Sequence, residues 1–222
     1  MSKDGCPIDH SSLKKKRDVG ANHESPSNQW PALGQTIELN THRMPSSIPR
    51  VVSETENNKT CPHSTKEGEE NWVYPSEQMF FNALKRKGYS VSEKDMKAVV
   101  AIHNTVNERT WQEILKWEEK RGEDVTKIRL AHFRGRPKDL SPKARFRNWI
   151  GYTLPFDRHD WTVDRGEGKR ARYVIDYYNG KPLPGMPGPS VYIDARPALD
   201  SPSAVLDRLR AFASRNLSRI FS

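Results

Sequence analysis

Residues 96–117 have the sequence MKAVVAIHNTVNERTWQEILKW, and this stretch decides how the folded part of the chain is built. Side chains spaced three and four residues apart form one continuous stripe on a helix. The stripe consists of Met96, Val100, His103, Asn107, Trp111 and Ile114. Its four apolar members predict a face buried in a core, whereas His103 and Asn107 interrupt it with polar groups. A polar break in an apolar face is a place where function is expected.

Other elements are expected on both sides of this helix. Residues 92–95 have the capping-box form for its start, and Gly122 follows its end. The expected helices are residues 76–87, 92–121, 143–150 and a last one beginning at 201–202. The expected strands are residues 128–133, 161–164, 172–178 and 190–195. Helices first, followed by a small antiparallel sheet with flanking helices, predict an α+β fold.

Residues 1–70 differ in composition from the remainder. They hold 16 apolar residues (23%), six prolines and many Ser, Asn, Thr and Glu, a composition too polar to offset the entropy of ordering a core. We therefore expect a mostly disordered tail over 1–70 and a single folded domain over 71–222. Within the tail, the two prolines of residues 44–50 favour an extended docking segment over a regular element.

The charge of the chain is concentrated in the expected domain. Residues 1–70 have a net charge of −1, whereas residues 71–222 hold 28 basic and 18 acidic residues, a net charge of +10. Such a surface suits phosphate backbones, anionic lipids or carboxylate ligands. The longest apolar run has five residues (98–102), far below the roughly 20 of a membrane-spanning helix. We expect no secretory signal, and two cysteines exclude a disulfide scaffold.

His103 has three possible roles on chemical grounds. It can be a general base, a metal ligand, or a structural histidine hydrogen-bonded to Asn107. A conventional zinc site needs three or four ligands, and no second His or Cys follows His103 by three or four residues. A haem iron takes one protein ligand on each face, and an apolar slot with a tryptophan fits a porphyrin. A haem site with Trp111 and Asn107 near His103 is the more specific hypothesis, and the structural role stays open beside it.

Two further groups of residues are candidates for chemistry. Both cysteines precede proline, at Cys6 and Cys61, and in a disordered segment such thiolates can ligate ferric haem; the alternative is two ordinary free thiols. Near the start of a strand, His159 has acidic residues on both sides. Asp157 is its better-placed partner, because the adjacent Asp160 points to the opposite face of a strand. Structural and catalytic roles both remain open for a His159–Asp157 contact.

Seven segments resemble the holocytochrome c synthase family, the mitochondrial cytochrome c-type haem lyases. The segments are residues 44–50, 72–80, 102–118, 141–145, 154–161, 172–178 and 194–200. They cover nearly all of residues 44–210 in order, and the two Cys-Pro pairs resemble the family's haem regulatory motifs.

The resemblance implies an enzyme of the lyase class that attaches haem b, its iron-containing substrate, to apocytochrome c or c1. Thioether bonds would join the haem vinyl groups to the two thiols of the client C-x-x-C-H motif. By that resemblance His103 is the axial ligand to the iron, the metal-binding residue of the chain, and Glu108 is a functionally important neighbour. His159 falls in another family motif and is the third candidate catalytic residue.

Several expectations accompany this resemblance. The haem propionates need cationic anchors, for which Arg158 and Arg165 are candidates because arginine pairs bidentately with carboxylates. Glu108 lies about 140° around the helix from His103, so we do not expect a direct bond to the imidazole. It could line the haem slot or meet the client. The family implies the mitochondrial intermembrane space, peripheral association with the inner membrane, and no nucleic-acid partner.

Two other classes of protein compete with the haem lyase. A non-catalytic haem chaperone or sensor would use the same His and Cys-Pro sites without forming thioethers. A nucleic-acid-binding protein is favoured by the pI of 9.6 and six tryptophans, but the sequence has no recognisable motif that reads DNA or RNA. The sequence leaves the choice between cytochromes c and c1, the electron donor and the mode of membrane attachment open.

Overall fold

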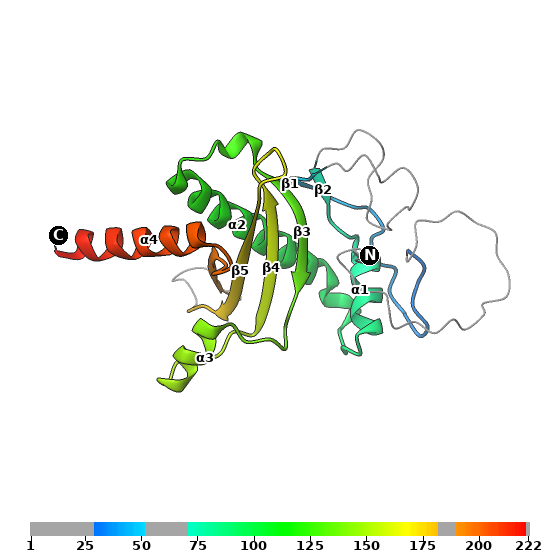
Figure 1. The fold of residues 1–222 in the computed structure, drawn as a ribbon. Helices are drawn as coiled ribbons and strands as arrows, with labels where there is room; N and C mark the ends of the chain where they lie inside the picture. Colours follow the sequence, from blue (N-terminus) through cyan, green and yellow to red (C-terminus); the bar gives the residue numbers. More distant parts are fainter. Residues whose placement is uncertain (1–28, 52–70, 182–189, 221–222) are drawn as a thin grey trace, which may run out of the picture. The chain divides into compact units, whose positions relative to one another are not determined.

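The computed structural model describes residues 29–51, 71–181 and 190–220, with side chains described up to residue 213 in the last helix (Figure 1). The chain divides into two compact units, Met1–Glu108 and Arg109–Ser222, and the division falls within helix α2 (Met96–Arg121). The predicted mixture of helices and antiparallel strands is confirmed. Cys6 and Cys61 lie outside the described residues, and the division of the chain at residue 70 stays a prediction.

The first unit contains a short two-stranded sheet that the sequence did not reveal. Strands β1 (Pro45–Pro49) and β2 (Asn71–Val73) pair antiparallel, so the expectation of no regular element at residues 44–50 is wrong. Both prolines stand at the ends of β1, where a missing N–H is tolerated. Between them Ser46 and Ile48 are buried while Ser47 is exposed, the alternation of a strand with one covered face.

The helices of the first unit follow the sequence pattern. Helix α1 (Glu77–Arg86) begins after Ser76, whose hydroxyl accepts the Met79 N–H at 3.2 Å, and it is followed by Gly88 with φ of +79°. A one-turn 3₁₀ helix η2 (Glu93–Asp95) leads into α2. A small core gathers buried side chains from the segment before β1, from α1 and from α2. Its members are Leu39, Phe81, Met96 and Val100.

The second unit is built on a four-stranded antiparallel sheet of order β3-β4-β5-β6. The strands are β3 (Arg129–Gly135), β4 (Asp157–Asp164), β5 (Arg170–Asn179) and β6 (Val191–Pro197). A 3₁₀ turn η3 (Val125–Lys127) precedes β3. All four lie where the sequence predicted strands, but β4 begins four residues earlier than expected. Its first residues are polar, and they enter the ladder because Asp157 through Asp160 pair with Tyr177 through Val174.

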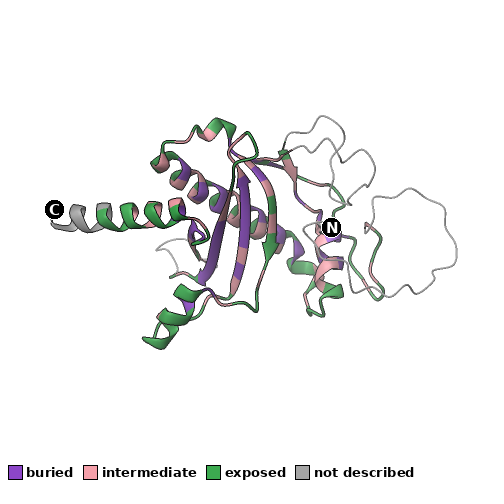
Figure 2. Ribbon diagram, viewed as in Figure 1, coloured by how far each residue is buried: buried purple, intermediate pink, exposed green. Residues whose placement is uncertain are grey.

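The C-terminal part of α2 runs along one face of this sheet (Figure 1). Trp111 and Ile114 of the predicted stripe are buried there, and the Trp117 indole N–H donates to the Ala195 carbonyl at 2.8 Å. The strands contribute a buried apolar row that is purple in Figure 2. Its members are Trp161, Val163, Tyr173, Ile175 and Tyr177. The apolar half of the stripe therefore marks core positions, as the spacing predicted.

The opposite face of the sheet is held by charge pairs. Arg196 donates to Asp176 at 2.5 Å, and Ser141 donates to the same carboxylate at 2.6 Å while capping helix α3 (Pro142–Trp149). Helix α4 (Pro202–Ile220) extends away from the sheet, and its Asp207 pairs with Arg121 (Figure 1).

None of the helices in the described ranges is long and apolar enough to cross a membrane.

Candidate functional site

His103 stands on α2 in the first unit, with its imidazole half-buried between aromatic rings. The Phe80 ring meets it edge-on at a centroid distance of 4.8 Å, and the Tyr74 ring does so at 6.4 Å. Tyr74 and Phe80 flank the start of α1, so both rings reach the histidine from one neighbouring segment. Phe80 also packs against the small apolar core of this unit. The polar break in the stripe therefore places a single imidazole among aromatic side chains.

Two asparagine amides surround the same ring. The Asn104 Oδ1 lies 3.4 Å from the His103 Nδ1, and the Asn107 amide nitrogen lies 3.3 Å from Nε2 and 3.4 Å from Nδ1. In the tautomer that carries its proton on Nδ1, this N–H donates to the Asn104 Oδ1, and Nε2 holds the lone pair that the Asn107 amide can donate to. These two amide contacts are long, and neither amide carries a charge. A neutral imidazole with one basic nitrogen is the form that ligates a metal ion.

Glu108 is directed toward β1 and Tyr74. Its Oε1 accepts from the Ser46 hydroxyl at 2.6 Å, from the Tyr74 hydroxyl at 2.9 Å and from the Ser47 N–H at 3.2 Å. The Ser47 hydroxyl donates to Oε2. Burial disfavours the ionised carboxylate, but the bonds from Ser46, Ser47 and Tyr74 outweigh it, so the pKa of Glu108 lies below its ordinary value. Glu108 is a charged anchor for β1.

Sequence reasoning missed the residues that hold Glu108. Ser46 and Ser47 lie about 60 positions away in the chain, and Tyr74 lies 34 positions away. Nothing in a local pattern pairs them, although all three fall in segments that carry the family resemblance. Tyr74 connects the two candidates, since its ring meets His103 while its hydroxyl donates to Glu108.

His159 lies in the second unit, in a different setting. Its Nε2 is 3.2 Å from the Asp157 Oδ2, the contact that the sequence favoured over Asp160. The Tyr177 ring meets the imidazole edge-on at 5.4 Å, and the Tyr177 hydroxyl pairs with Thr110 at 3.1 Å. Burial raises the pKa of Tyr177, so that hydroxyl stays protonated. The His159 Nδ1 is buried without a hydrogen-bond partner among the described residues.

The two arginines proposed as propionate anchors are engaged by carboxylates. Arg165 binds Glu118 through two bonds of 2.7 and 3.0 Å, and Tyr173 donates to the same carboxylate at 2.6 Å. Arg158 binds Asp160 at 3.0 to 3.3 Å. Burial by itself lowers the pKa of Arg165. The hydrogen bonds and charge of Glu118 raise that pKa by more, so the net shift is upward. Their role toward haem stays a prediction.

Glu118 is the polar residue that the sequence did not single out. Its side chain is fully buried (0% exposed), and it continues the α2 stripe one turn beyond Ile114. That spacing was the available signal for a carboxylate facing the core of the second unit. Trp111 is buried in this core as well, and its expected role in a haem slot stays a prediction.

The donor set of the first unit fits haem better than a free metal ion. Within the described ranges, no group of three His, Cys, Asp or Glu residues could hold a metal. The porphyrin supplies four nitrogen ligands to the haem iron. One imidazole next to aromatic side chains is therefore enough to ligate the iron on one face. His103 supplies the imidazole, and Phe80 and Tyr74 supply the surround.

Comparison with known proteins identifies the class to which this site belongs. A family model described as "Cytochrome c/c1 heme lyase" matches residues 2–212. The chain therefore belongs to the cytochrome c/c1 haem lyase family and is an enzyme of the haem lyase class. The resemblance drawn from its motifs is confirmed.

Individual relatives agree with this assignment. The holocytochrome c-type synthase of Homo sapiens is 43% identical over 92% of this chain and 73% of its own length. That of Gallus gallus is 44% identical over 92% of this chain and 71% of its own length. The holocytochrome-c synthase of Saccharomyces cerevisiae is 35% identical over 98% of this chain and 89% of its own length. No solved structure matches the chain.

Proposed function

We propose that this haem lyase attaches haem b to apocytochrome c or c1 through thioether bonds, with His103 as the axial ligand to the haem iron. The family and the names of the relatives support the attachment of haem to an apocytochrome. One observation carries the assignment to His103. It is a single imidazole with uncharged amide partners, half-buried between the Phe80 and Tyr74 rings.

In this proposal His103 acts as a template. Ligation on one face of the iron orients the porphyrin and leaves the opposite face for the histidine of the client motif. Each client S–H then adds across one vinyl C=C bond: sulfur bonds to one carbon, the hydrogen passes to the other, and nothing is released. Holding thiols and vinyl groups together removes the entropy cost of their encounter, which can contribute ~7 kcal/mol or more. Reduced thiols and ferrous iron are required, so an external electron donor is implied.

Glu108 and Tyr74 have positioning roles in this scheme. Three bonds from Ser46 and Ser47 fasten β1 to α2 beside His103, and the Tyr74 hydroxyl donates a fourth to the same carboxylate. Tyr74 is thereby fixed at its hydroxyl while its ring edge faces the imidazole. These donors already stabilise the negative charge of Glu108. We therefore assign Glu108 the role of holding β1 and Tyr74 in place around His103.

The proposed location is the mitochondrial intermembrane space, with peripheral association at the inner membrane. The clients implied by the relatives' names are cytochromes c and c1. The net charge of +10 over residues 71–222 supports contact with an anionic surface.

Co-expression with apocytochrome c tests the proposed activity. Covalent product is read on a denaturing gel stained for haem, and haem carried by the purified enzyme is read from its visible spectrum. His103→Ala should lose both signals, whereas His42→Ala, an exposed histidine of the same unit, should keep both. Haem binding by the wild type without covalent product would favour a chaperone or sensor and overturn the lyase mechanism.

A further inference from the structure

The segment from α3 to the start of β4 presents large apolar side chains to solvent in one contiguous group. It exposes six large side chains within eleven residues, which we name the aromatic tip. These are Phe146, Trp149, Ile150, Tyr152, Leu154 and Phe156. Trp149 is 81% exposed, although tryptophan is among the most buried residue types on average. An exposed apolar patch that is contiguous in this way marks an interaction site.

The aromatic tip is ordered by its own contacts. Phe146 and Trp149 lie 6.0 Å apart, and the Arg147 guanidinium lies 4.5 Å from the Tyr152 ring. The Tyr152 N–H donates to the Arg147 carbonyl at 2.9 Å across a turn made by Gly151, whose φ is +92°. That backbone conformation is one that glycine adopts without strain. The apolar side chains are therefore presented to solvent by a closed turn.

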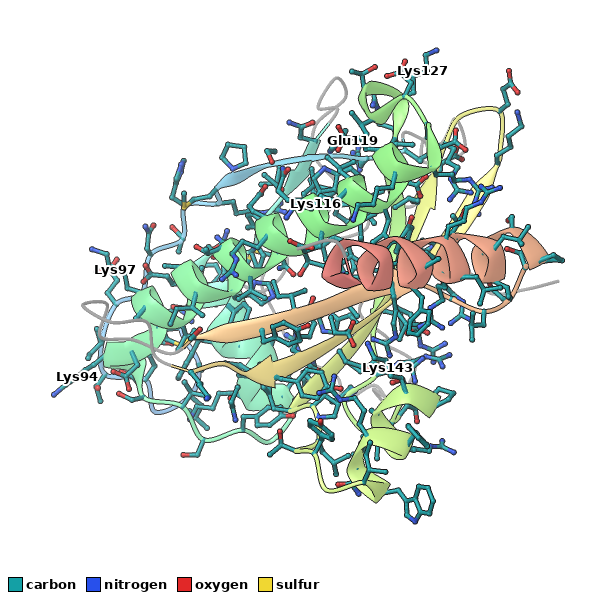
Figure 3. The ribbon with its side chains drawn as sticks, turned by 90° about the vertical axis from the view of Figure 1, so that its left-hand side faces the viewer. Lys94, Lys97, Lys116, Glu119, Lys127 and Lys143 are labelled. Carbon is teal, nitrogen blue, oxygen red and sulfur yellow. The ribbon has the colours of Figure 1, made fainter. Side chains whose placement is uncertain are left out.

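The base of the aromatic tip is fastened to the sheet of the same unit. Ser141 caps α3 and donates to the buried Asp176, and Lys143, labelled in Figure 3 between α3 and the strands, donates to Asp194 at 2.6 Å. At the other end the Phe156 N–H donates to the Tyr177 carbonyl at 2.9 Å. Figure 2 shows α3 as an exposed element beyond the end of the sheet. The segment is rigid at its root and apolar at its outer end.

Its charge is of one sign. Residues 140–156 contain Lys143, Arg145 and Arg147 and no Asp or Glu. Tryptophan and tyrosine prefer the level of lipid headgroups, where an apolar ring and a polar edge are both satisfied. Basic residues beside them attract anionic headgroups, at about 1 kcal/mol for each cation near the surface. Aromatic and arginine side chains are enriched at protein interfaces as well, so the one-sided charge beside the aromatic rings is the feature that favours an anionic bilayer.

We propose that the aromatic tip inserts into the interfacial layer of an anionic lipid bilayer and is the membrane-contacting surface of this chain. This inference rests on the proposed peripheral membrane association and adds the residues that carry it. Trp149, Ile150 and Tyr152 form the inserting end, and Arg145 contacts the headgroups. The contact is reversible and interfacial, because a short helix and one turn are too small to span the bilayer.

Vesicle flotation with the full chain tests this surface. The probes are vesicles of phosphatidylcholine with and without phosphatidylglycerol. The double variant Trp149→Ser with Tyr152→Ser should weaken partitioning at least about tenfold, since two exposed apolar side chains lose their insertion. The matched control, Trp30→Ser with Tyr89→Ser, removes an exposed tryptophan and tyrosine from the first unit and should bind as the wild type does. Arg145→Gln should weaken binding only to the vesicles that contain phosphatidylglycerol.

A second measurement separates insertion from charge attraction by the basic domain. Brominated lipid should quench part of the tryptophan fluorescence of the wild type. Trp149→Phe should still float with the vesicles but lose that quenching, because Trp149 is the only tryptophan of the aromatic tip. Retained quenching in Trp149→Phe would overturn the inference.

Three other results show whether only the membrane role of the aromatic tip is wrong or the proposed function is wrong as well. If the wild type binds vesicles and the double variant binds them equally well, the aromatic tip is not the contact, while membrane association stands. If the wild type does not bind vesicles, both statements about the membrane fail, and haem attachment is tested separately. If the double variant loses covalent haem attachment in detergent but keeps vesicle binding, the aromatic tip receives the client and the inference is overturned.

Discussion

His103 in the first unit and His159 in the second each meet a tyrosine ring edge-on, but their polar partners differ in kind. His103 has two uncharged amides at 3.3 to 3.4 Å, whereas His159 has the carboxylate of Asp157 at 3.2 Å. A hydrogen bond to an uncharged amide is compatible with an imidazole that ligates a metal, and a carboxylate orients an imidazole for proton exchange or for structure. In the proposed scheme this difference assigns iron ligation to His103 and leaves an acid–base or structural role to His159, two residues that the sequence grouped as candidate catalytic residues.

The sharpest test of this difference removes each imidazole in turn. His103→Ala should abolish haem occupancy and covalent product, because the variant lacks the imidazole that ligates the iron in the proposed scheme. His159→Ala should keep haem bound and lower the yield of product by a smaller factor. The measurement is the visible spectrum of the purified enzyme together with the haem-stained product. Equal loss of bound haem in both variants would remove the distinction.

Substitutions of Glu108 test whether the side chains around His103 are held in place by β1. Glu108→Ala removes the carboxylate that accepts from Ser46, Ser47 and Tyr74 and should lower the free energy of unfolding by roughly 2 kcal/mol, with a loss of haem occupancy. Glu108→Gln keeps the shape and one acceptor oxygen and should have an intermediate effect. Ser46→Ala, which removes one donor from the same carboxylate, should resemble Glu108→Gln.

Urea unfolding and haem content measured on the same preparations check this account. If Glu108→Gln and Glu108→Ala are equally inactive while both retain haem, the charge itself serves the client or a proton transfer. That result would contradict the positioning role.

The lowered pKa of Glu108 predicts how stability depends on pH. A carboxylate with a lower pKa in the folded chain stabilises it fully above its ordinary value of 4.5 and loses this contribution as the pH falls through the folded value. The urea midpoint of the wild type should therefore fall as the solution is acidified below about pH 4.5. Glu108→Gln should flatten part of this fall, whereas Glu119→Gln on the exposed face of α2 should not.

The smallest effect is expected in the N-terminal segment. Cys6→Ala together with Cys61→Ala should retain substantial attachment activity at saturating haem, because both cysteines fall in the stretch whose composition is predicted to be too polar to hold a rigid catalytic geometry. The double variant is compared with the wild type in the haem-stained gel assay at high and limiting haem. Loss of product at saturating haem in a folded double variant would show that a tail thiol takes part in the chemistry.

Much of the fold followed from short-range pattern. The apolar members of the α2 stripe are buried where the spacing placed them, because side chains three or four residues apart share a helix face whatever surrounds them. Ser76 and Ser141 cap α1 and α3 because a hydroxyl next to a helix start accepts a nearby N–H. These features depend on neighbours within one or two turns, which a single sequence displays.

The remaining features depend on partners far away in the chain. Strand β1 pairs with β2 more than 20 residues later, and nothing near Pro45 or Pro49 announces that partner. The bonds from Ser46 and Tyr74 to Glu108 and the bond from Arg165 to Glu118 join distant segments in the same way. The sequence therefore singled out Glu108 through the family motif, while only the structure connects it to β1.

Rescue by free imidazole tests the central claim most directly. The cavity left in His103→Ala can admit imidazole from solution, which then supplies the missing nitrogen to the iron. The account predicts that His103→Ala, folded as judged by its circular dichroism, lacks the haem absorption of the wild type and regains it when imidazole is added. His103→Ala with wild-type haem absorption before imidazole is added, or a folded variant that imidazole cannot restore, would contradict the assignment of His103 as the haem ligand.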